Sequence, residues 1–391
     1  MNMEFSRTVQ RFGDEIFAAL NEKKIALEKQ GKTIYNMSVG TPDFETPEHI
    51  KRALIEAAKN QDSWKYALRD SDRLVEAVIS YYQKRFGVTL RPDQIQSCNG
   101  TQEGMGHIGM VLANEGDTVL LPTPCYPVFI TSVKMAGAEP WYYPMTAENG
   151  FLPRVSDIPE DVACRAKYMV VSLPSNPMGS VGTPELYEEI IAFAKKYDIL
   201  IVHDNAYSDI IFDGVEGRSF LSYPGAMDVG VEFFSLSKSF NLTGARISFL
   251  VGRSDVVQAY KKLHTQIDFG MFLPVQEAAI AALTGPLDSV KEQCRKYQER
   301  RDALCGGFRS IGWDMVDSHG SMFVWAPIPK QYQSRNSMAF CLDLIEKSGV
   351  ICTPGSSFGP LGEGYVRFAL VLPPDKIREA VESVKKSGIL G

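Results

Sequence analysis

The chain has 391 residues, of which 45% are hydrophobic and 23% are charged, a balance typical of a globular enzyme. The formal net charge of −6 and the sequence pI near 5.6 argue against nucleic acid or an anionic membrane surface as a partner. A chain of this length exceeds most single domains, so we expect two compact units that share a cleft.

The seven cysteines are odd in number and scattered without a C-x-x-C spacing, which predicts neither a zinc cluster nor a disulfide framework. The N-terminal residues lack the apolar core of a signal peptide, and no apolar run reaches the length of a bilayer-spanning helix. We therefore expect a reduced, cytoplasmic protein with no metal and no contact with a membrane.

Between about residues 45 and 270, short β-rich runs alternate with helical patterns. The predicted strands are 94–98, 118–121, 140–143, 168–173, 200–203, 231–235 and 247–251. The intervening segment 183–197 is a typical helix, with Thr183 as its cap and Pro184 in its first turn. The alternation predicts the α/β class, with a mostly parallel seven-stranded sheet flanked by helices in a large domain.

The rest of the chain is predicted to form a smaller α+β domain. A long helical pattern covers residues 276–309, interrupted near Thr284. Strands are then predicted at 322–326, 350–352 and 365–370, followed by a closing helix at 374–386, and residues 13–30 are also helical. We assign residues 1–44, as an N-terminal arm, and residues 281–391 to this small domain, and residues 45–280 to the large one.

Lys238 lies in the most informative segment, just after the strand that ends at Ser235. Apolar surroundings disfavour its ammonium form, and the free amine is the nucleophile that forms a Schiff base with an aldehyde cofactor. Ser235, Ser237 and Arg246 are residue types that bind a phosphate. Together they predict a site for pyridoxal 5′-phosphate (PLP), although S-x-x-K by itself is more typical of a solvated surface lysine.

Polar residues also follow two neighbouring predicted strands. A carboxylate such as Asp204 keeps a pyridine nitrogen protonated, and Tyr207 could bind the phenolic oxygen of the ring. Asp204 taken alone is more typical of a helix N-cap. Asn176, in the sequence N-P-M-G, either contacts the cofactor oxygen and the substrate carboxylate or belongs to a plain turn.

Three further features complete the candidate site. Gly100, Thr101 and Gln102 precede a helix, where backbone N–H groups present themselves to an anion. Tyr126, in P-x-x-Y-P, could stack on a pyridine ring or pack in a rigid loop. Arg367 has apolar neighbours in its strand and needs a charged partner, which is either a substrate carboxylate or an internal acid.

These motifs occur in a characteristic order: G-T-P-D from Gly40, N-G-T-Q-E, P-x-x-Y-P, N-P-x-G, D-x-x-Y, S-x-S-K…R and the late arginine. The series resembles the fold-type I PLP enzymes and, more narrowly, the class I/II aminotransferases, from about residue 34 to the C-terminus. The run 203–209 and Asp268-Phe-Gly are similar to the LL-diaminopimelate aminotransferase group. Two departures are Met178, where the family usually has threonine, and the turn after Tyr66, which lacks a glycine.

The resemblance implies catalytic roles for Lys238, Asp204 and Tyr207. It implies a PLP site made by Gly100, Thr101, Gln102, Tyr126, Asn176, Asp204, Tyr207, Ser235, Ser237, Lys238 and Arg246, with Tyr66 reaching the phosphate of the other subunit of a homodimer. The α-carboxylate of the substrate would be bound by Gly40, Asn176 and Arg367. No metal is implied.

The implied activity is transfer of an amino group between an L-amino acid and a 2-oxo acid, by a ping-pong mechanism through Lys238. Aspartate is less expected, because the loop 267–272 lacks an arginine for a second carboxylate. One alternative is a PLP-dependent carbon–sulfur β-lyase, which needs the same lysine. Another is a non-enzymatic regulatory or binding protein with this fold.

Overall fold

The computed structural model describes residues 3–12 and 18–391, and its centre is a seven-stranded sheet with the order β2-β8-β7-β6-β5-β3-β4. The strands are β2 (Ile95–Cys98), β3 (Thr118–Thr123), β4 (Glu139–Pro144), β5 (Ala166–Ser172), β6 (Leu200–Asn205), β7 (Gly230–Ser235) and β8 (Ser248–Gly252). β8 is antiparallel to its two neighbours, and the other pairs are parallel. The predicted α/β class and mostly parallel sheet are confirmed.

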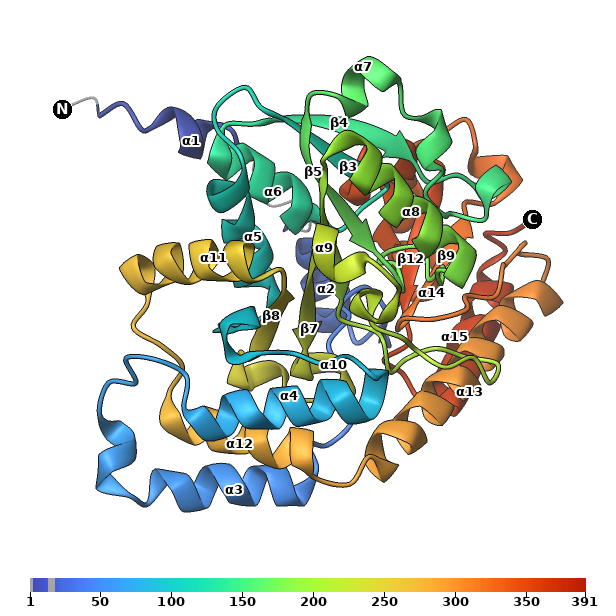
Figure 1. Ribbon diagram of the computed structural model, residues 1–391. Helices are drawn as coiled ribbons and strands as arrows, with labels where there is room; N and C mark the ends of the chain where they lie inside the picture. Colours follow the sequence, from blue (N-terminus) through green and yellow to red (C-terminus); the bar gives the residue numbers. More distant parts are fainter. Residues whose placement is uncertain (1–2, 13–17) are drawn as a thin grey trace.

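Helices cover both faces of this sheet (Figure 1). They are α4 (Asp72–Phe86), α5 (Thr101–Leu112), α6 (Pro127–Ala136), α8 (Pro184–Tyr197), α11 (Ser254–Ile267) and α12 (Leu273–Thr284). Phe233 and Leu250 pack with α5, α6 and α11 on one face. Phe234 and Val251 point to the opposite face and join a core completed by α4, α8 and α12. Because successive strand residues alternate between two covered faces, the strands are apolar throughout.

Two smaller sheets lie beside the C-terminal helices. β1 (Tyr35–Asn36) pairs in parallel with β10 (Val350–Ile351), and β11 (Thr353–Pro354), β12 (Tyr365–Ala369) and β9 (Phe323–Pro327) form an antiparallel sheet in the order β11-β12-β9. The surrounding helices are α13 (Asp288–Ser310), α14 (Ser337–Ser348), α15 (Pro374–Ser387) and the N-terminal α2 (Ala18–Lys29). The arm thus joins the last third of the chain, in keeping with the domain assignment, whose bounds stay a prediction.

The remaining helices are short or lie at the edges: α1 (Arg7–Gln10), α3 (Glu48–Ala58), α7 (Glu160–Ala163), α9 (Ala226–Val229) and α10 (Leu236–Ser239). In the predicted N-terminal helix, residues 13–17 lie outside the described residues. The sequence did not predict β1 and β11, because two residues are too few to show an alternating pattern. The predicted strand 350–352 corresponds to β10 and is one residue longer, and β11 begins directly after it at Thr353, which pairs with Arg367 in the other sheet.

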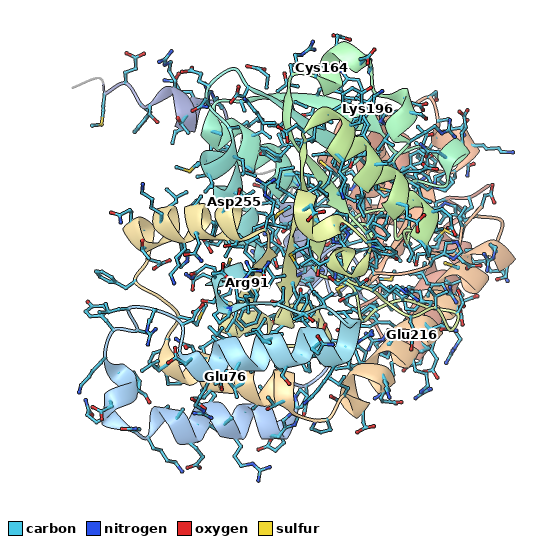
Figure 2. All side chains as sticks on the ribbon, in the orientation of Figure 1. Glu76, Arg91, Cys164, Lys196, Glu216 and Asp255 are labelled. Atoms are coloured by element: carbon cyan, nitrogen blue, oxygen red, sulfur yellow. The ribbon has the colours of Figure 1, made fainter. Side chains whose placement is uncertain are left out.

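The outer surface carries the polar side chains. Figure 2 shows charged residues such as Glu76, Lys196 and Asp255 on the outside of their helices, and all six labelled residues are exposed. Among residues 3–12 and 18–391, no helix combines the length and the apolar character that crossing a bilayer requires.

Candidate active site

A cavity of about 490 Å³ lies at the edge of the central sheet where β5, β6 and β7 end. Twelve of the predicted site residues line it: Gly40, Thr101, Gln102, Tyr126, Asn176, Asp204, Tyr207, Ser235, Ser237, Lys238, Arg246 and Arg367. The carboxyl ends of parallel strands meet at one edge, so residues far apart in the sequence converge there. Gly100 and Tyr66 are the two predicted residues that do not line this cavity.

Lys238 sits in α10, the single turn that follows β7, and its Nζ donates to the carbonyl oxygen of Gly40 at 2.8 Å. Burial of the amine, aided by the positive charges of Arg367 and Arg246, lowers the pKa of Lys238 to about 8. Its backbone carbonyl accepts from Nε2 of Gln293, on α13, at 2.6 Å. The lysine is therefore held in place and is ready to act as a nucleophile.

Asp204 is a buried carboxylate near the end of β6, and its Oδ1 has no hydrogen-bond partner among residues 3–12 and 18–391. Burial raises the pKa of Asp204 to about 6, while the neighbouring His203 opposes that rise. A buried acceptor without a donor is costly, so the site suits a ligand that brings a donor. Tyr207 is also buried, and burial raises the pKa of its phenol, which stays protonated as a donor.

Arg367 lies on β12, buried between the rings of Phe323 and Phe358, whose centroids are 4.1 and 4.7 Å from its Cζ. Its guanidinium donates to Oδ1 of Asn176 at 2.9 Å and to the carbonyl of Ser38 at 2.8 Å. Burial lowers the pKa of Arg367 to about 10, so it remains charged at neutral pH. Within the described residues it has no carboxylate partner, so the predicted internal acid is absent and the charge suits an incoming carboxylate.

The predicted phosphate cradle is formed by the start of α5 and the loop after α10. Gly100 has φ of 84° at the helix cap, and a side chain there would collide with the guanidinium of Arg246, which explains the glycine. The buried Oγ1 of Thr101 has no hydrogen-bond partner in the part of the chain that the structure describes. Backbone N–H groups of a helix start, hydroxyls and an arginine are the donors that hold a phosphate.

The two predicted aromatic residues have different places. The hydroxyl of Tyr126 donates to Oε1 of Gln102 at 2.6 Å, which fixes its ring at the wall of the cavity. Tyr66 is 80% exposed and lies outside the cavity, with its ring centroid 5.2 Å from that of Phe269. Any role for Tyr66 at a PLP site therefore depends on a second subunit.

Several lining residues were not predicted, among them Ser38, Phe323 and Phe358. Ser38 contributes only its backbone carbonyl, and the two phenylalanines belong to apolar segments that carry no chemical motif. The close contact of Gly40 with the Phe323 ring leaves no room for a side chain at Gly40. In the sequence, the G-T-P-D motif that begins at Gly40 was the one feature that pointed to this side of the cavity.

The hydrogen-bonding and charged groups that line the cavity match the groups that PLP presents. The free oxygen of Asp204 suits a protonated ring nitrogen, Tyr207 suits the ring oxygen, and the donors around Arg246 suit the phosphate. The amine of Lys238 is on hand for the aldehyde. The fold and the cavity thus define the class: a PLP-dependent enzyme with an α/β architecture.

The chain belongs to the family described as aminotransferase class I and II, which matches residues 32–384. LL-diaminopimelate aminotransferase of Moorella thermoacetica is 40% identical over 388 residues, which cover 98% of each chain. The enzyme of the same name from Halothermothrix orenii is 40% identical over 389 residues, 99% of each chain. Substrate-bound BacF from Bacillus subtilis has a TM-score of 0.93 at 34% identity, covering 98% of each chain.

The protein is therefore a PLP-dependent aminotransferase of fold type I, as the sequence predicted. The names of the relatives favour transamination over the carbon–sulfur lyase and over a non-enzymatic role.

Proposed function

We propose that Lys238 binds PLP and carries the substrate's α-proton during transamination. The observation that carries this proposal is the position of its amine, which lies inside the cavity with a pKa of about 8 and within 2.8 Å of the Gly40 carbonyl. An amine with a pKa near the working pH accepts a proton and returns it with little bias in either direction. Bound PLP supplies the electron sink that makes the α-proton acidic.

The neighbouring residues orient the reacting groups in this proposal. Asp204 holds a proton on the ring nitrogen, because its Oδ1 gains there a hydrogen-bond partner that the described residues do not offer. Arg367 and Asn176 receive the α-carboxylate of the substrate, which places the α-carbon toward Lys238. Tyr126 lines the cavity and is held by its hydrogen bond to Gln102.

The absorption spectrum of the purified protein with PLP tests this assignment. We expect a visible band from lysine-bound PLP, and we expect L-glutamate to bleach it as the amino group moves to the cofactor. Lys238→Ala should lack the band and the turnover while still binding PLP through the phosphate donors. Full activity in Lys238→Ala would remove the central claim.

For the substrate, we propose LL-diaminopimelate as the first amino donor to test, with 2-oxoglutarate as acceptor. Two relatives that are 40% identical over nearly the whole chain bear that name. Turnover of aspartate should be weak, because the loop Ile267–Phe272 contains no arginine. Glutamate formed from each donor is the quantity to measure, and faster turnover with aspartate would contradict this assignment.

We also propose that the protein is a homodimer. Four exposed aromatic residues gather where the segment before α4 meets the loop between α11 and α12 (Figure 1): Trp64 lies 5.3 Å from Phe272, and Tyr66 lies 5.2 Å from Phe269. An exposed apolar cluster of this kind is typical of an interface. Sedimentation equilibrium should give twice the 43.4 kDa of one chain.

A cytoplasmic location also remains our proposal. It is supported by the cysteines, none of which forms a disulfide in the structure. Cell fractionation tests it, and recovery of the protein outside the cytoplasm would contradict it.

A further inference from the structure

We propose that Glu103 is a positioning residue that fixes the Asn99–Gln102 turn and thereby sets the affinity of the site for the phosphate of PLP. The inference rests on the proposed PLP site and adds to it a residue that does not line the cavity. Glu103 is the third residue of α5, so its side chain can reach back over the start of its own helix.

The first step is the bond between Glu103 and the turn. Its Oε2 accepts from the backbone N–H of Asn99 at 3.0 Å, which fixes the peptide unit between Cys98 and Asn99. Gly100 has a positive φ of 84°, a conformation that the chain leaves easily when nothing holds it. The N–H of Gly100 donates to the carbonyl of Cys98 at 2.7 Å, so fixing this turn holds in place the start of α5, where the N–H groups of Thr101 and Gln102 are presented.

The second step is what holds Glu103 itself. Its Oε1 accepts from the hydroxyl of Tyr260 at 2.9 Å and lies 2.6 Å from Nδ1 of His107. Nε2 of His264 lies 3.8 Å from Oε2, and this buried nitrogen has no hydrogen-bond partner among the described residues. Tyr260 and His264 belong to α11, which packs against α5, so the carboxylate is fixed from a second helix.

A second contact, from the residue that follows α11, holds the turn through the side chain of Asn99. Nδ2 of Asn99 donates to Oδ2 of Asp268 at 2.7 Å. Asp268 directly follows α11, and its N–H donates to the carbonyl of His264 at 2.8 Å. The end of α11 therefore controls both the backbone and the side chain at Asn99, one residue before the predicted phosphate donors.

The negative charge of Glu103 indicates that this residue positions the phosphate donors and does not attract the phosphate itself. A phosphate carries nearly two negative charges at neutral pH, so a carboxylate close to the same helix start opposes its binding. Glu103 can favour phosphate binding only through its hydrogen bonds, which hold the donors in place. Glu103→Gln keeps an acceptor for the Asn99 N–H and removes the repulsion, whereas Glu103→Ala removes the acceptor.

The experiment titrates the apo-protein with PLP and, separately, with pyridoxal, which lacks the phosphate. We expect Glu103→Ala to raise the Kd for PLP about tenfold, the effect of losing one hydrogen bond to a charged group. The Kd for pyridoxal should stay unchanged. Glu103→Gln should bind PLP within about threefold of wild type, since its amide oxygen replaces the acceptor. The matched control is Glu185→Ala, which removes an exposed carboxylate from the first turn of α8 and should change neither Kd.

The ratio of the two dissociation constants decides the question. The proposal is overturned if Glu103→Ala leaves the ratio of the Kd for PLP to the Kd for pyridoxal unchanged, whether both constants rise together or neither moves. A general structural defect would weaken the binding of both compounds alike, with or without a phosphate. If Glu103→Ala does not fold, Tyr260→Phe removes one donor to the carboxylate, and a PLP-specific weakening of two- to fivefold is then required. Wild-type protein that binds neither compound would instead overturn the PLP site of Lys238 itself.

Discussion

Lys238 should titrate far below an ordinary lysine, and the structure gives the size of the effect. Its pKa falls from 10.5 to about 8, chiefly through burial and then through Arg367 and Arg246. That difference corresponds to about 3 kcal/mol of preference for the neutral amine. At pH 8 about half of Lys238 is free amine, compared with about 0.3% of a lysine with a pKa of 10.5.

Competitive labelling of the apo-protein with acetic anhydride between pH 6 and pH 11 measures this directly. The extent of acetylation at Lys238, read by mass spectrometry, should show a midpoint near pH 8. Lys65 is the internal reference, because its hydrogen bond to Asp62 raises its pKa above 10.5. Arg367→Met should raise the midpoint of Lys238 by less than half of the difference from 10.5, since burial is the larger cause and remains.

The reasoning fails if Lys238 in the wild-type protein titrates near pH 10. It also fails in part if Arg367→Met and Arg246→Met both leave the midpoint where it was, because the two arginines would then contribute nothing. Circular dichroism of each variant checks that the cavity has not opened, which would restore an ordinary pKa for a different reason.

Further expectations concern the same site and the surface near it. Lys238→Met should stabilise the apo-protein by up to about 3 kcal/mol below pH 8, because the folded wild-type protein buries an ammonium there. The gain should shrink between pH 8 and 10.5, where only the unfolded chain still holds that proton, and urea unfolding at several pH values measures it. Asp204→Asn should lower kcat on the order of 10²–10³-fold with PLP still bound, because a buried charge pair is lost; normal kcat would argue against the ring-nitrogen assignment. Arg367→Lys should raise KM for the amino donor about 100-fold, since lysine cannot match the two-pronged geometry of a carboxylate. Phe269→Asp should shift sedimentation toward the monomer if the exposed aromatic cluster is the dimer interface.

The predictable part of the site follows from one rule of parallel sheets. Asn176 and Lys238 each follow a strand that the sequence shows as a short apolar run, Asp204 lies near the end of another, and the carboxyl ends of such strands meet. The chemistry of the side chains at these strand ends then indicates PLP as the cofactor. The predicted strand ends differ from those in the structure by only a few residues, because the apolar runs in the sequence stop where polar side chains begin.

The contacts that no local pattern reveals were missed. Gln293 holds the carbonyl of Lys238 from a helix 55 residues further along the chain. Phe323 and Phe358 enclose Arg367 from two segments that look like ordinary core. The network of Glu103 depends on how α11 lies on α5, which the sequence of neither helix specifies.

The two arginines near Lys238 connect binding to chemistry. Arg246 and Arg367 together help to hold the Lys238 amine neutral while no anion is bound. A phosphate at Arg246 and a carboxylate at Arg367 would each cancel one of these positive charges, and the pKa of the amine would rise accordingly. An amine whose basicity increases when both anions are in place becomes a stronger proton acceptor only once the substrate is bound. If Arg246 and Arg367 bind these two anions, as we propose, they also determine when Lys238 can take the α-proton.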